Sequence, residues 1–306
     1  MSASVNPGTE TPMPPASQQA PAARPALETP RSIQRDRIRL LLRSPSFIFG
    51  MIILVFWIVM AIFGPLIVPY NADDTDLLNT LTPPSGDHWF GTDQFGRDVF
   101  SRVIVGSRDI LVVAPLATLL GTVVGTILGL ITGYARGLTD DIVSRIVDAF
   151  LALPLLIIAM LVITALGISN TTVIVVIGLS FGLVVGRTVR AAVLGERDLD
   201  YIAAANLRGE KPLYIMFVEI LPNVMPPILV ETTVRLGYAI FTVASLSFLG
   251  LGIQPPSPDW GLSISQNYGL IGGGYWWTVL FYALAIGSLV IGVNLTAEGV
   301  QSVFDA

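Results

Sequence analysis

The chain has no cysteine and a single histidine, His88, among its 306 residues. The absence of cysteine excludes a disulfide framework and a thiolate metal site. Charge is also scarce, since Asp, Glu, Lys and Arg make up 13% of the residues, whereas hydrophobic residues make up 53%. A soluble domain does not need so much apolar sequence, but a helical bundle that faces lipid does. The composition therefore predicts an integral membrane protein.

Lysine is nearly absent as well, because Lys211 is the only one in the chain. A loop that cradles the phosphates of ATP needs Gly-Lys-Ser or Gly-Lys-Thr at the start of a helix. Lys211 instead lies between Glu210 and Pro212. The sequence thus predicts no ATPase site, no catalytic residues and no bound cofactor in this chain. Any energy for its work comes from another subunit or from a gradient.

Apolar runs without charged residues predict an all-α fold with six transmembrane helices. A helix needs about 20 apolar residues to cross a bilayer. The 38 uncharged residues between Asp148 and Arg187 are enough for two spans, which separate at the turn-like residues 167–170. The six predicted spans are residues 47–68, 110–134, 149–166, 172–190, 223–249 and 276–297.

The positions of Lys and Arg predict the orientation of these helices. Basic residues lie before the first span and in the two loops that follow the second and fourth spans, whereas aspartates dominate the loop after the first. The positive-inside rule therefore places both termini in the cytoplasm. The basic residues are Arg31, Arg35, Arg37, Arg39, Arg43, Arg136, Arg145, Arg187, Arg190, Arg197, Arg208 and Lys211.

The chain divides into four predicted parts. Residues 1–32, rich in Pro and Ala, form a disordered cytoplasmic tail without the apolar stretch of a cleavable signal peptide. Residues 33–69 carry the first span, and residues 70–108 form an extracytoplasmic loop with a short helix at its end. Residues 109–306 form the core domain, which includes a cytoplasmic loop at about 195–222 and an irregular outer loop at 251–275.

The cytoplasmic loop between the fourth and fifth spans is rich in small residues. Ala203, Ala204 and Ala205 lie on a predicted short helix, Gly209 permits a turn after it, and Leu221-Pro222 leads into the fifth span. Small side chains let another surface approach closely. Spacing alone leaves two interpretations open, an ordinary helix–turn–helix or a docking helix.

Three separated motifs together resemble one family. The alanine segment with Gly209 and Leu221-Pro222 resembles the EAA loop of bacterial ABC importer permeases. The segments 89–99 (WFGTDQFGRDV) and 247–261 (SFLGLGIQPPSPDWG) resemble the first periplasmic loop and the signature after span five of the dipeptide/oligopeptide/nickel permease family, C-type subunit. The resemblance covers about residues 33–306. Two positions depart from the pattern, because Ala203 stands where the family often has an acid and Glu219 where it often has His.

The resemblance implies a fold, a mechanism and partners. The fold would be that of a type I ABC importer, multi-pass in the bacterial cytoplasmic (inner) membrane, with cytoplasmic termini. The chain would pair with a B-type permease subunit, and two ATP-binding subunits would hold ATP and Mg. An external solute-binding protein would deliver cargo across the lipid bilayer, and no nucleic acid is involved. The expected ATPase contacts are Ala203, Ala204, Ala205 and Gly209, with Leu221 and Pro222 leading into the membrane.

Glu231 and Arg235 lie inside the apolar fifth span. They are spaced i,i+4 with the acid first, the favourable order for an ion pair on a helix. A charge that faced lipid at this depth would cost about 2.5–3.5 kcal/mol or more, so both side chains are expected to face protein or water. Two interpretations remain open. The residues line the translocation path, or they form a self-paired bridge that holds the fifth span against a neighbour.

Four glycines of the second span, Gly121, Gly125, Gly129 and Gly133, recur at a strict spacing of four. They lie on one helix face and permit close approach of another helix. We expect this face to serve packing, either within the subunit or against its partner.

The 70–108 loop offers no convincing metal site. His88 is expected to be a solvated histidine, and Asp73, Asp74 and Asp76 lack the Gly and closing Glu of a calcium loop. Arg97 and Asp98 either seat the binding protein or hold the loop together.

The substrate is predicted from the resemblance, with di- or oligopeptides as the default. Nickel chelates, glutathione and oligosaccharides are the alternatives within the family. An ion-coupled secondary transporter is the alternative from another class, but no earlier span carries a charged pair that matches Glu231 and Arg235.

Overall fold

The computed structural model describes residues 41, 43–135 and 137–304. The predicted tail at 1–32, the arginines before Arg43, and Arg136 lie outside the described residues. Within this part the chain is helical, and its nearest approach to a strand is an isolated bridge between Thr92 and Asp98. The long helices are α2 (Pro45–Ile67), α3 (Val99–Ala135), α6 (Asn170–Arg197), α9 (Leu221–Phe248) and α11 (Trp277–Phe304). The shorter ones are α4 (Leu138–Leu151), α5 (Leu155–Leu166), α7 (Asp200–Leu207), α8 (Pro212–Tyr214) and α10 (Trp260–Asn267).

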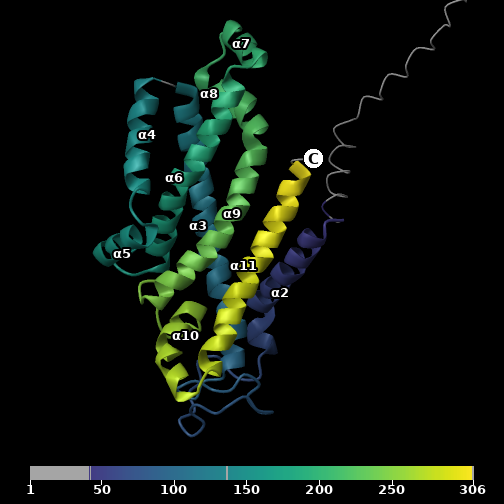
Figure 1. Cartoon of the computed structure of the whole chain (residues 1–306), viewed down its shortest axis with the longest axis vertical. Coiled ribbons are helices and arrows are strands. Elements are labelled where there is room, and N and C mark those ends of the chain that lie inside the picture. The colour runs from purple at the N-terminus through teal and green to yellow at the C-terminus, as the bar shows by residue number, and fades with distance from the viewer. Residues whose placement is uncertain (1–40, 42, 136, 305–306) are drawn as a thin grey trace, which may run out of the picture.

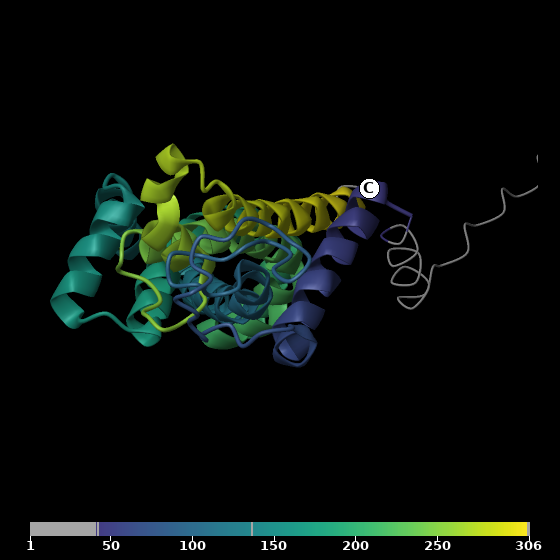
Figure 2. The same ribbon diagram turned by 90° about the horizontal axis from the view of Figure 1, so that it is seen from below.

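The long helices run alongside one another between two different ends (Figure 1). α7 lies at one end, which we call the α7 end. The connection between α2 and α3, residues 68–98, lies with α10 at the other end, which we call the loop end. Viewed from the loop end, α2 and the α4–α5 pair lie on opposite sides of the bundle (Figure 2).

Five described helices are long and apolar enough to cross a membrane, and a sixth crossing is reached if one bent helix pair counts as a span. The five are Pro45–Ile67, Val99–Ala135, Asn170–Arg197, Pro212–Phe248 and Trp277–Ser302. The prediction of an all-α membrane fold with about six spans is therefore confirmed.

The predicted third span at 149–166 is wrong as a single helix. The chain bends by 90° between a helix that ends at Leu151 and one that begins at Leu155. Pro154 explains the break, because proline lacks an N–H and disfavours helical backbone in the residue before it. α5 has 12 residues, or about 18 Å of helix, which is shorter than the hydrocarbon core.

Two loops contain more helix than expected. Residues 99–108 are not a separate short helix, because they form the first turns of α3. The segment 251–275 is not irregular throughout, because it contains α10 and a 3₁₀ helix at Tyr268–Gly273. α10 begins where the side chain of Asp259 accepts a hydrogen bond of 2.8 Å from the Leu262 N–H, a standard N-terminal cap.

The buried apolar residues form two clusters. The larger one lies toward the loop end and joins α2, α3, α6, α9, α10 and α11 around Trp57, Ile110, Ile240 and Trp260. The smaller one lies toward the α7 end and joins α3, α6, α7 and α9. α7 is thus anchored to the membrane bundle by its own core.

Candidate functional site

α7 has one buried face and one open face at the α7 end of the bundle. Ile202 and Ala205 are buried in the smaller core cluster. Ala203 and Ala204 are exposed, and Leu207 at the end of the helix is 90% exposed. Because the exposed side chains next to Leu207 are small, another protein surface can approach the α7 backbone closely.

The structure separates the three predicted alanine contacts. Ala203 and Ala204 are available to a partner, but the Ala205 side chain points into the core and is fully buried. A direct contact between the Ala205 side chain and a partner is therefore incompatible with this fold. The 3.6-residue period of the helix is the reason, since three consecutive residues cannot share one face.

Gly209 ends α7 in the left-handed region, with φ = +75°. Its N–H donates to the Asn206 carbonyl at 3.0 Å, and the N–H of Glu210 donates to the Ala205 carbonyl at 3.2 Å. This pair of bonds is the Schellman motif, which favours glycine at the position after the cap. Gly209 therefore shapes the turn after α7, and no neighbouring atom lies within 4 Å of where its side chain would begin.

Polar contacts tie both flanks of α7 to the start of α9. The Tyr201 hydroxyl donates to Glu196 at 2.7 Å and accepts from the Asn223 side chain at 3.2 Å. Burial, together with the bond to Glu196, raises the pKa of Tyr201 to about 12. The hydroxyl therefore stays protonated and remains a donor over the whole physiological pH range.

Beyond the turn, Arg208 binds two carboxylates. Its Nε lies 2.7 Å from Glu210 and its Nη2 lies 3.4 Å from Glu219. Glu219, at a position where the resembled family often has histidine, thus has an internal role in holding the turn after α7.

Leu221 and Pro222 lie where the chain enters the long α9 helix. Leu221 is half-buried and packs on the smaller core cluster, whereas Pro222 is exposed in the first turn. A π-helical turn, Ile215–Ile220, directly precedes them. Proline lacks the N–H that a regular helix would donate to the carbonyl of Val218, so regular α-helical pairing fails at this point.

Glu231 and Arg235 form an ion pair within α9, with 2.6 Å between Arg235 Nε and Glu231 Oε1. Their side chains are 16% and 20% exposed. The Arg235 guanidinium also lies 5.1 Å from the ring centre of Tyr238. Arg235 and Tyr238 line a cavity of about 640 Å³ whose other walls come from α3, α4, α5 and α6. The Glu231 and Arg235 side chains therefore bind each other, and Arg235 also borders a cavity.

The glycine face of α3 packs against α6 within this chain. A side chain on Gly121 would meet the Gly178 carbonyl at 2.9 Å, and one on Gly125 would meet the Gly182 carbonyl at 2.6 Å. Gly129 likewise faces the Gly186 carbonyl at 2.8 Å. Gly133 completes the face by lying against Val193. The two backbones are so close that no side chain fits between them.

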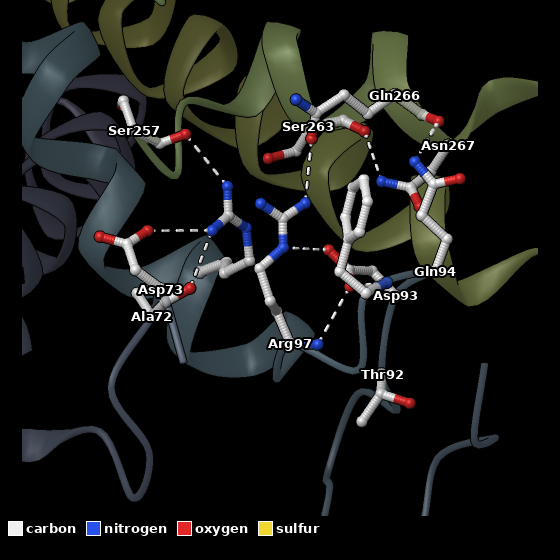
Figure 3. A network of polar contacts seen from close by, with 12 residues as sticks. Ala72, Asp73, Thr92, Asp93, Gln94, Arg97, Ser257, Ser263, Gln266 and Asn267 are labelled. Carbon is white, nitrogen blue, oxygen red and sulfur yellow. Dashed lines mark hydrogen bonds and ion pairs between the residues drawn. The ribbon is translucent and has the colours of Figure 1, made fainter. Parts of the chain in front are cut away.

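A polar network holds the 68–98 loop onto α10 at the loop end (Figure 3). Arg97 Nε donates to Asp93 at 2.7 Å, and its Nη2 donates to the Gln266 side chain at 2.9 Å. The Gln94 side chain donates to the Gln266 carbonyl at 3.1 Å. Arg97 is 8% exposed. Its guanidinium is therefore occupied in holding the loop, which favours the structural interpretation over a docking role.

Arg102 joins three segments at the same end of the bundle. Its Nη1 donates to the Ala72 carbonyl at 2.8 Å and to Asp73 at 3.2 Å, and its Nη2 donates to the Ser257 carbonyl at 3.0 Å. The side chain is fully buried. Because a buried guanidinium needs these acceptors, it fixes the positions of both loops relative to α3.

The expectation that His88 is solvated is wrong. Its Nδ1 lies 3.0 Å from Asp98, its side chain is 14% exposed, and its ring lies 4.7 Å from the ring of Tyr70. Asp98 also caps α3, because it accepts 2.8 Å and 2.7 Å bonds from the Ser101 N–H and hydroxyl. Among the described residues, no three His, Asp or Glu side chains come together as a metal site.

Asp259 lies at the junction of α10 and the preceding loop and is buried. Burial, reinforced by the nearby carboxylate of Asp109, raises the pKa of Asp259 to about 6. Ser257 separates the two acids, since its hydroxyl donates to Asp109 and accepts from the Asp259 N–H at 3.1 Å.

Several of these residues were absent from the sequence predictions. Gly178, Gly182 and Gly186 of α6 recur at the same spacing of four as the glycines of α3. The sequence alone shows this pattern. The buried role of Arg102 left no comparable signal, because its partners lie 29 to 155 residues away along the chain and meet it only in the fold.

These features define a multi-pass helical membrane protein with a structured loop at one end and, at the other, the short helix α7 with one buried and one exposed face. Two family models match its sequence. Residues 125–306 match the binding-protein-dependent transport system inner membrane component, and residues 32–84 match the N-terminal transmembrane domain of oligopeptide transport permease C. The chain belongs to the family of binding-protein-dependent inner-membrane transport components, in the permease C group.

Curated relatives agree with this placement. The dipeptide transport system permease protein DppC of Alkalihalophilus pseudofirmus is 36% identical over 89% of this chain and 89% of its own length. The oligopeptide transport system permease protein OppC of Bacillus subtilis is 36% identical over 84% of each chain. The di/tripeptide transport system permease protein DppC of Pseudomonas aeruginosa is 32% identical over 94% of this chain and 96% of its own length.

A solved structure shares the fold. A chain of the MetNI methionine ABC transporter in inward-facing conformations superposes with a TM-score of 0.55 at 21% sequence identity. The match covers 66% of this chain and 96% of that one. The shared fold is thus that of an ABC importer permease.

Proposed function

We propose that this chain is the C-type permease subunit of an ATP-driven importer and forms half of the translocation path for di- or oligopeptides. Three relatives of 32–36% identity are named for dipeptide, oligopeptide or di/tripeptide transport. Peptide is therefore the cargo that the comparisons favour over a nickel chelate, glutathione or an oligosaccharide.

The observation that carries the proposal is the open face of α7. Ala203, Ala204 and Leu207 are exposed on a helix whose other face is buried in the bundle core. A helix anchored in this way transmits force to α9 as a rigid element. We infer that this face docks into an ATP-binding subunit, and that Gly209 shapes the turn without touching the partner.

This role sets the orientation and the partners. The α7 end faces the cytoplasm, both termini lie there, and the loop end faces the external solute-binding protein. A B-type permease completes the path, and two ATP-binding subunits supply ATP and Mg, because the chain has no phosphate-binding loop.

We assign the cavity beside Arg235 to the half of the translocation path that this chain forms. It lies between α9 and the α4–α5 pair, and Glu231 and Arg235 form the charged pair next to its apolar walls. Opposite charges close together suit the amino and carboxylate groups of a peptide.

The test is ATP hydrolysis by the importer in lipid vesicles, stimulated by peptide-loaded binding protein. Ala204→Trp places a large ring on the open face of α7 and should abolish stimulation and release the ATP-binding subunits. Ala149→Trp, on the exposed side of α4, is the matched control and should leave both unchanged. Full stimulation in the Ala204→Trp variant would refute the docking role of α7.

Uptake separates the remaining alternatives. Import that survives a proton uncoupler but stops on ATP depletion supports the importer, and the reverse result supports an ion-coupled transporter. Competition by excess dipeptide, nickel chelate, glutathione or oligosaccharide then identifies the cargo, and competition by a non-peptide alone would refute the peptide assignment.

A further inference from the structure

An apolar groove lies on the side of the bundle away from the α4–α5 pair. Its volume is about 520 Å³, and its walls come from α2, α3 and α9, with Val293 of α11 behind them. Ile58, Ile62 and Val112 are exposed along it. The groove is separate from the cavity beside Arg235, because the two share no lining residue.

Arg108 is the one charged side chain among the described residues that line the groove. It is exposed, and no hydrogen bond or ion pair joins its guanidinium to another described residue. The neighbouring charges are engaged elsewhere, since Asp109 accepts from Ser257 and Arg102 binds Asp73. Arg108 is therefore a free cation in a span.

The depth of Arg108 follows from the packing of α2 on α3. A side chain on Gly64 of α2 would lie 2.9 Å from Ile104 of α3, so these residues are level. Arg108 lies one turn further in, which places its backbone about 10 Å inside the end of α2. An arginine side chain at this depth extends back toward the headgroups, where phosphate is its natural partner.

The apolar part of the groove continues inward from Arg108. Leu54 and Pro115 line it at the deeper end, about 12 Å along the helix axis from Ile62. Its shape and chemistry thus match a charged headgroup at the interface and an acyl chain below it.

We propose that this groove binds an anionic phospholipid of the leaflet at the loop end, with the phosphate on Arg108 and an acyl chain along α2 and α3. A protein partner is less suited to this surface, because the remaining described lining residues offer no polar side chain to fix its position. α2 is also the least buried of the five candidate spans, at 17% of its apolar window, as expected of a helix surrounded by lipid.

The test measures lipids retained by the intact importer from nanodiscs of equal phosphatidylglycerol and phosphatidylcholine, by native mass spectrometry. Arg108→Gln should lower the phosphatidylglycerol-to-phosphatidylcholine ratio about fivefold, the preference expected of one cationic contact. Arg108→Lys should keep most of the ratio. Arg145→Gln, at an exposed arginine of α4, is the control and should not change it.

A second variant addresses the apolar part of the groove. Val112→Trp should fill it and reduce retained lipid while the guanidinium remains. An unchanged lipid ratio in Arg108→Gln would overturn the proposal. So would loss of the partner permease from Arg108→Gln in phosphatidylcholine alone, since that result would identify a partner carboxylate as the occupant. Peptide-stimulated ATP hydrolysis, measured on the same samples, reports the transport function separately.

Discussion

Arg190 of α6 holds Asp140 of α4 through two parallel hydrogen bonds, 2.6 Å from Nε and 2.7 Å from Nη2 to the two carboxylate oxygens. Asp140 is 6% exposed. This bidentate contact is the strongest polar link between α4 and the bundle. It holds the short helix beside the cavity that we assign to the translocation path.

Arg190→Gln should release α4 from α6. Loss of a charge-assisted pair in this partly buried position should weaken α4 packing by about 2 kcal/mol. Hydrogen exchange at residues 138–151 measures the effect. Arg187→Gln is the matched control, since Arg187 and Asp148 are 3.7 Å apart and more than 60% exposed, and such pairs contribute little. Equal exchange in the two variants would contradict the assignment.

Gly125→Ala should force α3 and α6 apart. The new methyl group would lie 2.6 Å from both the Gly182 carbonyl and Val185 Cβ, and such overpacking costs about 1–3 kcal/mol. Thermal unfolding of the purified chain provides the measurement. Gly195→Ala on α6 is the control, because its side chain would meet nothing within 4 Å, and it should be neutral or stabilising.

Gly209→Ala should disturb the turn after α7. A residue with a side chain pays about 1–2 kcal/mol for the left-handed conformation. We expect lower peptide-stimulated ATP hydrolysis with α3–α6 packing unchanged. Gly209→Asn should recover part of the activity, because asparagine tolerates this conformation better. If alanine and asparagine behave alike, the backbone requirement is not the cause.

Glu231→Gln should be more harmful than removal of both charges. The single change leaves Arg235 without its partner inside a span, at a cost of about 2.5–3.5 kcal/mol, which thermal unfolding would detect. The double variant Glu231→Gln with Arg235→Gln should regain stability but import peptide more slowly if the pair serves the path. Normal import by a stable double variant would assign the pair to structure alone.

Asp259 should make stability depend on pH. Its pKa rises from 3.8 to about 6 in the folded chain, so the folded state binds the proton more tightly than the unfolded state. Stability is therefore greatest below about pH 4 for this group and falls by about 2–3 kcal/mol as pH rises to 6 and above. Unfolding measured between pH 4 and 8 tests this.

Asp259→Asn provides the comparison for that pH profile. Asparagine keeps an oxygen that can accept from the Leu262 N–H, but it has no charge to bury. The variant should be more stable than the natural chain above pH 6 and should lose the dependence on pH between 4 and 6. An identical pH profile in both proteins would exclude Asp259 as the source.

The linear order of apolar runs was sufficient to locate most membrane helices. α2 and α9 begin and end within two residues of the predicted spans, because a helix in lipid satisfies its own backbone hydrogen bonds and needs only length and apolar side chains. The prediction of a single helix for the third span was wrong for a local reason. Pro154 interrupts an apolar run that hydropathy alone reads as continuous.

The sequence singles out candidate site residues only where they lie close together on one short segment. Ala203, Ala204 and Gly209 could be singled out from spacing, but the burial of Ala205 could not, since it depends on which face of α7 meets the core. The sequence predicts a solvated His88 and leaves two roles open for Arg97. Both side chains are held by partners in the fold, and one partner of Arg97, Gln266 of α10, is 169 residues distant.

Composition and hydropathy thus determined that this protein is a helical membrane protein, because that property follows from residue types along the chain. The tertiary structure decided which glycines face each other, where Arg190 finds Asp140, and that Arg108 borders an apolar groove with no ion-pair partner among the described residues. Those outcomes depend on side chains brought together from distant helices. Distances across a fold, unlike hydropathy along a helix, are set only when the helices pack.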